Sequence, residues 1–231
     1  MHNESNFNPE GDSMLNPESR PDNYNRDDNY VTYSKTIEKC LPLSCFCERG
    51  ELIKNGGFEI PSVVPGQVFS DWSLGLSSEG INMSSTTDNV YEGNSAASIQ
   101  TTITPTAESR RLQLRQNVIV TPGCLYGLKF AERLVALGET GTDLPTLIVR
   151  IYYVSQGFAE YNLLNKVIQK TKIDRKYNLH HMTARIPVPC NVSGIIVQFE
   201  FFITDSGGTV WNLDGVSLRA LSKISACCCK E

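Results

Sequence analysis

The sequence predicts an all-β protein whose two antiparallel sheets pack as a jelly-roll or related sandwich. From Leu52 to Leu221 it breaks into short runs of alternating apolar and polar residues, separated by Gly, Pro, Asn and Asp, which is the pattern of strands joined by turns. Helix signals are few, and roughly eight to ten short strands are expected, a number typical of two packed sheets. A chain of 231 residues is long enough for one such domain with tails.

The clearest runs predict the following strands in chain order. Residues 112–120 alternate up to a turn at 121–123 and residues 125–130 alternate again, so a hairpin is expected between them. Further strands are expected over 146–154, 182–187, 194–204 and 209–218. Residues 161–172 fit either a short helix or an edge strand, and their charged ends favour the strand.

The longest apolar run, residues 194–204, has two different faces. Every second residue from Ile195 to Phe201 is apolar, and these side chains share one face because a strand has a period of two. The opposite face carries Gln198 and Glu200 among apolar side chains. We expect the first face in the core and the second, mixed face to line a groove.

The ends of the chain differ from this middle in charge and composition. Residues 1–34 hold seven acidic residues and two arginines, a net charge of -5, against -4 for the whole chain. They are rich in Asn, Pro and Ser, and such a segment buries too little apolar surface to offset the entropy of ordering. We therefore expect four parts: a flexible acidic arm (1–39), a cysteine-rich linker (40–50), the jelly-roll domain (51–221) and a short cysteine-rich tail (222–231).

Most of the cysteines lie in the linker and the tail. Six of the eight are found there: Cys40, Cys45, Cys47, Cys227, Cys228 and Cys229. Adjacent cysteines do not readily pair with each other, because a disulfide needs Cα atoms about 4.4–6.8 Å apart. Disulfides between copies of the chain, giving a homo-oligomer or polymer, are the favoured interpretation. Inert thiols are one alternative and a zinc site is another, although the latter lacks paired C-x2-C spacing. Cys124 and Cys190 border strands and are expected to pair within the chain or to pack.

Charge, hydropathy and motifs argue against several functions. A pI of about 5.5 gives no basic footprint for nucleic acid. No run reaches the roughly 18 apolar residues of a membrane span, and the first residues lack the blocks of a secretory signal. With three histidines and no H-E-x-x-H, G-x-S-x-G or phosphate-loop motif, few groups are available for nucleophilic catalysis. We expect a protein that is not an enzyme, binds no nucleic acid and does not insert into membranes.

Five short segments, taken in order, resemble the jelly rolls of carbohydrate-binding modules, the galactose-binding-like fold. They are Leu52–Glu59, Asp71–Ser73, Glu92–Ala97, Leu114–Tyr126 and Trp211–Leu218, and they span most of residues 51–219. The resemblance implies that the first and last strands lie side by side. It also implies binding in place of catalysis, without indicating a particular sugar.

The resemblance further implies a structural calcium ion and suggests where a glycan would bind. In similar modules the acids that match Glu59 and Asp214 help to hold calcium with backbone carbonyls, here those of residues 92–94, and calcium takes such oxygen ligands. No other cofactor is expected. Alternation places Tyr152 beside Arg150 on the outer face of a sheet, and Trp211 is a further ring for sugar stacking. The alternative for these rings is packing.

Together these features favour a structural surface protein. A binding-type jelly roll with cysteines at both ends and no secretory signal suggests a self-assembling layer or fibre subunit of a bacterial spore coat, exosporium or cell surface. Jelly-roll contacts and intermolecular disulfides would hold such an assembly. The alternative function is a carbohydrate-binding module for an envelope or environmental glycan, and the alternative location is the cytoplasm.

Overall fold

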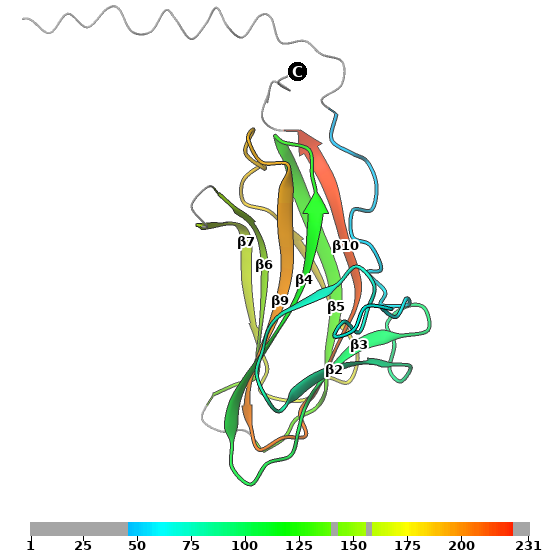
Figure 1. Ribbon diagram of the computed structural model, residues 1–231, viewed down its shortest axis with the longest axis vertical. Coiled ribbons are helices and arrows are strands. Elements are labelled where there is room, and N and C mark those ends of the chain that lie inside the picture. Colours follow the sequence, from blue (N-terminus) through cyan, green and yellow to red (C-terminus); the bar gives the residue numbers. More distant parts are fainter. Residues whose placement is uncertain (1–45, 140–142, 156–158, 224–231) are drawn as a thin grey trace, which may run out of the picture. The chain divides into compact units, whose positions relative to one another are not determined.

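The computed structural model describes residues 46–139, 143–155 and 159–223, which belong to one compact unit. These residues form ten strands and no helix (Figure 1). The strands are β1 (Ser73–Ser77), β2 (Ile81–Thr86), β3 (Ala96–Thr101), β4 (Glu108–Ile119), β5 (Cys124–Ala136), β6 (Thr146–Val154), β7 (Glu160–Gln169), β8 (Asn178–Thr183), β9 (Gly194–Asp205) and β10 (Val210–Lys223). In this part of the chain no helix could span a membrane.

The strands form two antiparallel sheets of five strands each, which confirms the predicted all-β jelly-roll sandwich. Sheet I has the order β1-β4-β9-β6-β7, and sheet II has the order β2-β3-β10-β5-β8. The long strands β4 and β9 of sheet I and β5 and β10 of sheet II run along the length of the sandwich (Figure 1). The side chains between the sheets form the hydrophobic core.

Strict alternation along β9 supplies the centre of this core. Ile195, Phe199 and the other predicted inward residues are at most 2% exposed. The ring of Phe199 lies 6.2 Å from that of Trp72 and 5.1 Å from that of Phe130, which belongs to sheet II. Fully burying one such side chain contributes about 1.5–3 kcal/mol, so these contacts hold the two sheets together.

Most of the expected strands are found, with some shifts at their ends. The strand β6 has the predicted bounds, and β9 runs one residue further than predicted. Residues 160–169 form a strand, β7, as the charged ends of this segment indicate. The strand β8 begins upstream of the predicted segment, and β10 continues to Lys223.

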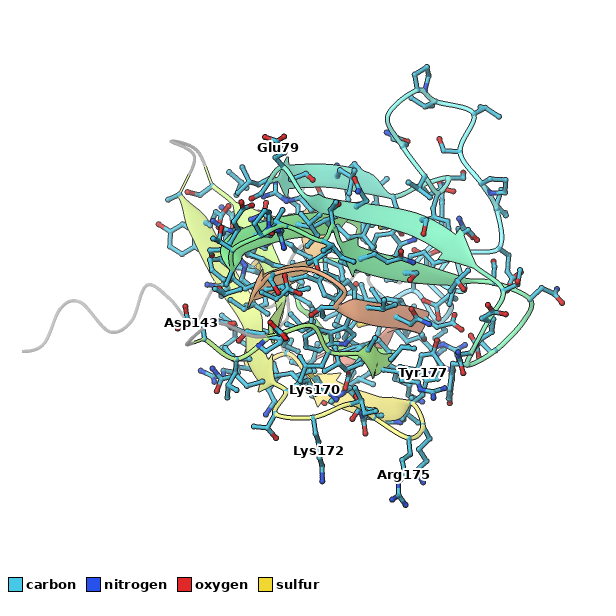
Figure 2. The ribbon with its side chains drawn as sticks, turned by 90° about the horizontal axis from the view of Figure 1, so that it is seen from below. Glu79, Asp143, Lys170, Lys172, Arg175 and Tyr177 are labelled. Atoms are coloured by element: carbon cyan, nitrogen blue, oxygen red, sulfur yellow. A yellow bond between two sulfur atoms is a disulfide. The ribbon has the colours of Figure 1, made fainter. Side chains whose placement is uncertain are left out.

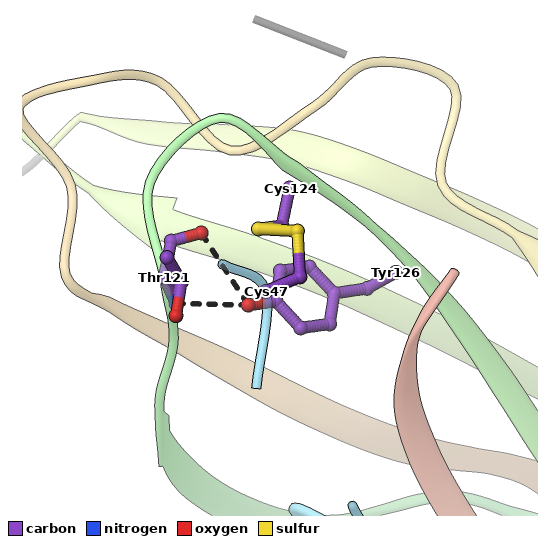
Figure 3. Close-up of a disulfide and its surroundings, with 4 residues drawn as sticks. All are labelled: Cys47, Thr121, Cys124 and Tyr126. Atoms are coloured by element: carbon purple, nitrogen blue, oxygen red, sulfur yellow. Dashed lines mark hydrogen bonds between the residues drawn. A yellow bond between two sulfur atoms is a disulfide. The ribbon is translucent and has the colours of Figure 1, made fainter. Parts of the chain in front are cut away.

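The expected hairpin between residues 112–120 and 125–130 is wrong. The first run lies in β4 of sheet I and the second in β5 of sheet II, so the turn at 121–123 crosses between sheets. A tyrosine hydroxyl holds this crossing (Figure 3). The Tyr126 hydroxyl accepts a hydrogen bond from the Thr121 amide nitrogen at 2.8 Å and lies 3.4 Å from the Thr121 carbonyl oxygen. Gly123 has a φ of 77°, which glycine adopts without strain.

The expectation that the first and last strands lie side by side is wrong, because β1 pairs with β4 in sheet I and β10 lies in sheet II. It is the irregular chain preceding β1 that runs beside β10. The Leu52 amide donates to the Leu218 carbonyl at 3.0 Å, and the Val216 amide donates to the Gly56 carbonyl at 3.0 Å. A Cβ at position 56 would lie 1.9 Å from the Val216 carbonyl oxygen, so only glycine allows this approach. The segment therefore covers the β10 backbone before the regular strands begin.

A disulfide joins this segment to β5. Cys47 is bonded to Cys124 of the same chain, with their Cα atoms 5.8 Å apart (Figure 3). The prediction that Cys47 links separate copies is therefore wrong, because its sulfur is already bonded. Cys190 is also a disulfide cysteine. The other predicted cross-linking residues lie outside the described part of the chain: Cys40, Cys45, Cys227, Cys228 and Cys229.

Candidate functional site

The outer face of sheet I carries a group of charged and amide side chains, which we call the arginine face. Its members come from β4, β6 and β9: Arg111, Gln113, Arg115, Arg150, Tyr152, Gln198, Glu200 and Phe202. Leu112 and Leu114 of β4 are buried in the core, so the residues between and beside them point outward. The strand register then aligns Arg115 with Gln198 and Gln198 with Arg150.

Glu200 is the carboxylate at the centre of the arginine face, and its side chain is 3% exposed. Its Oε1 accepts a hydrogen bond from Nε of Arg111. Its Oε2 accepts one from Nε2 of Gln198 at 3.1 Å and lies 3.6 Å from Nη2 of Arg150. At the rim, Glu160 accepts a hydrogen bond from Nη1 of Arg150 at 3.1 Å. Two guanidinium groups therefore share one buried carboxylate.

Arg115 has only amide partners. Its Nε donates to Oε1 of Gln198 at 2.7 Å, and its Nη2 donates to Oε1 of Gln113. No carboxylate in the described ranges forms an ion pair with it. Gly75 of β1 makes room for this side chain, because a Cβ there would lie 2.7 Å from Nε of Arg115. The positive charge of Arg115 is therefore not balanced on this face.

The aromatic rings of the arginine face lie next to guanidinium groups. Tyr152 is 1% exposed, so the prediction that its ring is open to a sugar is wrong. The Arg150 guanidinium lies 5.1 Å from this ring, and the Tyr152 hydroxyl is 3.2 Å from Oε1 of Gln198. Burial raises the pKa of Tyr152, so the hydroxyl keeps its proton and can donate. Phe202 is 38% exposed, and the Arg111 guanidinium lies 5.8 Å from its ring.

Trp211, the other ring predicted to bind a glycan, lies in the core instead. It is fully buried on β10, and its Nε1 donates to Oε2 of Glu132 at 2.7 Å. Its ring packs against that of Phe201 at 5.7 Å. A sugar cannot reach this ring, so the prediction for Trp211 is wrong. The alternation of β10 explains the result, because Trp211 shares its inward face with Leu213.

Glu132 belongs to a buried polar cluster next to Trp211. Its Oε1 lies 2.7 Å from Nζ of Lys170, which Figure 2 labels, and 3.2 Å from Nε2 of His180. Lys170 also lies 2.7 Å from Oδ2 of Asp174. Burial by itself would raise the pKa of Glu132, but the hydrogen bonds from His180, Lys170 and Trp211 and the charge of Lys170 lower it overall. The cluster has its partners within the fold and is a structural feature.

The two acids implied to hold calcium are both bound to the loop of residues 91–95. Oε1 of Glu59 accepts hydrogen bonds from the amides of Asn94 and Ser95, at 2.8 and 3.2 Å. Oδ2 of Asp214 accepts from the amides of residues 91 and 92, at 2.8 and 3.1 Å, and Oδ1 accepts from that of Gly215 at 2.7 Å. Burial, partly offset by these amides, raises the pKa of Asp214 to about 6.

This donor set does not fit a calcium ion. The loop turns N–H groups, which a cation repels, towards both carboxylates, whereas calcium needs oxygen atoms. The described residues also contain no group of three or more His, Cys, Asp or Glu side chains placed to hold a metal. The calcium site stays a prediction from the resemblance, and the observed contacts to both acids are hydrogen bonds from backbone amides.

The outer face of sheet II has basic side chains of a different kind. Lys129 and His181 lie opposite each other on β5 and β8, and both are exposed. Together with Arg219 they line two hollows of about 320 and 480 Å³. Arg219 is paired with Glu51 at 3.3 Å. In the described residues, no network of amides and a buried carboxylate connects these three basic side chains. The outer face of sheet II therefore serves as a control surface for the arginine face.

The sequence indicated only part of the arginine face. The mixed face of residues 194–204 was expected to line a groove, and Gln198 and Glu200 do lie together on the outer face with Arg150. Arg111 and Arg115 were not identified, since the expectation of a sugar site rested on aromatic rings. Their signal is the alternation of polar residues with Leu112 and Leu114 along β4.

The fold and this open sheet face place the chain among jelly rolls of the kind found in carbohydrate-binding modules. No protein family and no curated protein matches the sequence. Similar solved structures include TmCBM61 in complex with β-1,4-galactotriose, with a TM-score of 0.50 and 17% identity over 74% of this chain and 99% of that one.

Two further structures give the range of the likeness. The enzymatically active domain of tailspike protein 4 of bacteriophage CBA120 has a TM-score of 0.51 and 14% identity, and the match covers 74% of this chain but 21% of that one. The CBM22-1 xylan-binding domain of Xyn10C from Paenibacillus barcinonensis has a TM-score of 0.44 and 12% identity, over 75% and 96% of the two chains. At such identities the likeness shows the fold alone.

Proposed function

We propose that this protein is a non-catalytic module that binds a glycan on the arginine face. The observation that carries the proposal is the set of partly exposed guanidinium groups, those of Arg111, Arg115 and Arg150, which buried amide and carboxylate side chains hold on one outer sheet face. Sugar hydroxyls both donate and accept hydrogen bonds, and groups of these kinds are able to bind them. The fold shared with TmCBM61, which was solved with a galactotriose, supports the proposal.

The state of the central carboxylate supports binding without catalysis. Glycoside hydrolysis uses a pair of carboxyl groups, one of which gives a proton to the leaving oxygen. Both oxygens of Glu200 are engaged, by Arg111 on one side and by Gln198 and Arg150 on the other. Glu200 thus positions Arg111 and Arg150, and Glu160, which pairs with Arg150 at the rim, is 44% exposed.

Affinity electrophoresis in gels that contain single polysaccharides, both neutral and acidic, tests this proposal. We expect at least one polysaccharide to slow the wild-type protein, and Arg150→Gln to remove most of that retardation because it removes a donor from the centre of the face. The matched control is Arg219→Gln on sheet II, which should behave as wild type. Failure of every polysaccharide to slow the protein, or equal loss in both variants, contradicts the proposal.

A further inference from the structure

The charges of the arginine face do not balance, and this imbalance carries information about the ligand. The face holds three guanidinium groups, those of Arg111, Arg115 and Arg150, but one buried carboxylate, that of Glu200, which pairs with Arg111 and Arg150. Glu160 adds a second negative charge, but at the exposed rim. The face therefore has a positive charge in excess although the whole chain has a net charge of -4. An uncharged ligand would leave this excess charge unpaired.

The arrangement of the aromatic rings is unsuited to an uncharged sugar. Neutral sugars stack on the bare faces of aromatic rings, whereas here the ring of Tyr152 is buried beneath the Arg150 guanidinium. Arg111 lies near the ring of Phe202 in the same way. A cation on an aromatic face is itself a favourable contact, so a sugar ring would have to displace it. The groups that the face offers to solvent are guanidinium planes.

One of these guanidinium groups keeps an unused Nη donor. Nε of Arg150 also has no hydrogen-bond partner in the described part of the chain, but it is buried and out of reach of a ligand. Arg115 uses Nε and Nη2 for amide oxygens, while its Nη1 has no partner among the described residues. A guanidinium group pairs with a carboxylate through two parallel hydrogen bonds, a geometry that few other ligand groups match.

From these contacts we propose that the glycan bound on the arginine face is acidic and carries the carboxylates of uronic acids. A ligand carboxylate pairs with Arg115, and the partly exposed guanidinium groups of Arg111 and Arg150 contact the neighbouring hydroxyls. This inference rests on the proposed function, since it names the class of glycan for the same face. Such a ligand differs from the neutral galactotriose in the TmCBM61 complex.

Binding of the full chain to soluble polysaccharides, measured by calorimetry at low and high salt, tests the inference. The probes are polygalacturonate and alginate, which are acidic, and β-1,4-galactan, which is neutral. We expect at least tenfold tighter binding to an acidic polysaccharide than to the galactan, and weaker binding in high salt because salt screens the exposed charges.

Variants of Arg115 locate the charge that matters. Its partners are neutral, so Arg115→Gln leaves no buried charge unpaired, and we expect it to weaken binding to the acidic polysaccharide about tenfold or more. Arg115→Lys keeps the charge but loses the paired hydrogen bonds, so its affinity should be intermediate. Arg219→Gln removes one charge from sheet II and should change affinity less than twofold. A thermal melt of each variant checks the fold, and Arg115→Lys carries the test if Arg115→Gln does not fold.

Other binding results contradict either the acidic class of glycan or the proposed function itself. If the galactan binds as tightly as the acidic polysaccharides, the acidic class is wrong while the proposed function stands. If no polysaccharide binds, the proposed function itself fails. Equal binding of polyglutamate or dextran sulfate overturns the inference, because the face then selects polyanions in general. An Arg115→Gln protein that binds the acidic polysaccharide like wild type overturns it as well.

Discussion

At the scale of single residues, the buried carboxylate of Glu132 is held by donors from two strands and a loop. Lys170, His180 and Trp211 all contact it, and their combined effect exceeds the cost of burial, so the pKa is lowered from its ordinary value of 4.5. A lowered folded-state pKa means that this group stabilises the protein above pH 4.5. That stabilisation is lost as the pH falls through the folded-state pKa.

We therefore expect Glu132→Gln to lower the free energy of unfolding by about 3 kcal/mol at pH 7, because it leaves Lys170 without its buried partner. The difference in unfolding free energy between the variant and wild type should narrow as the pH falls below 4.5 and through the folded-state pKa, where the wild-type carboxylate becomes protonated. Urea unfolding of both proteins at pH 7 and at a pH below 4.5 measures this difference. Glu79→Gln, a change at an exposed residue (Figure 2), is the control. A loss of unfolding free energy that is the same at every pH contradicts the lowered pKa of Glu132.

Asp214 gives a pH dependence of the opposite sign. Its folded-state pKa of about 6 lies above the ordinary value of 3.8, so this group lowers the stability of the fold as the pH rises from 3.8 to about 6, and the loss is complete above that pH. From pH 7 to pH 5 we expect the free energy of unfolding of wild type to increase relative to that of Asp214→Asn, which cannot titrate. Urea unfolding at several pH values provides the measurement, and parallel curves for the two proteins would refute this prediction.

The face on which a residue lies could be predicted at this scale, but its exposure could not. Alternation placed Tyr152 and Arg150 on the same outer face, and the structure agrees. That Arg150 would lie over Tyr152 and exclude solvent depends on rotamers and on neighbours from β9, which are distant in sequence. The prediction for Trp211 was wrong for a different reason, because this residue shares the inward face of β10 with Leu213.

At the scale of elements, strand existence was easier to predict than strand partnership. The period of two identifies β6 and β9 almost residue for residue, because alternation is a local property. Whether β4 and β5 pair or separate into two sheets depends on the turn between them. There Tyr126 fastens the crossing at Thr121, and no local period reports such a contact.

The disulfide between Cys47 and Cys124 is the strongest tie between a segment and a strand. It closes a loop with a sequence separation of 77 residues, and a loop of that size restricts the unfolded chain considerably. We expect the double variant Cys47→Ser, Cys124→Ser to lose about 2–4 kcal/mol of unfolding free energy. Thermal melts with and without reductant measure the loss, and wild type treated with reductant should resemble the variant. An unchanged melting temperature in both cases would show that the bond contributes little.

At the scale of the whole molecule, covalent assembly stays a prediction about the cysteines outside the described residues. If they link copies, the purified protein should form a ladder of bands on a non-reducing gel and a single band after reduction. The control replaces Cys40, Cys45, Cys190, Cys227, Cys228 and Cys229 by serine, so that Cys190 is not left as a free thiol, and keeps Cys47 and Cys124. A single monomer band of wild type in both lanes rules out the cross-linking. Retention of the ladder by the control would place the links elsewhere.

The position of the Cys47–Cys124 bond also decides how the domain responds to force. Cys124 lies opposite Lys223 in the pairing of β5 with β10, so a pull applied at residue 46 and at residue 223 acts on one rung of sheet II. Because the disulfide carries the force, the residues between Cys47 and Cys124, which are 77 positions apart in the sequence, are not stretched. Tension then separates β5 from β10 by breaking their hydrogen bonds one after another from this end. The two strands therefore separate at a lower force than when they are pulled from opposite ends, which loads many hydrogen bonds at once.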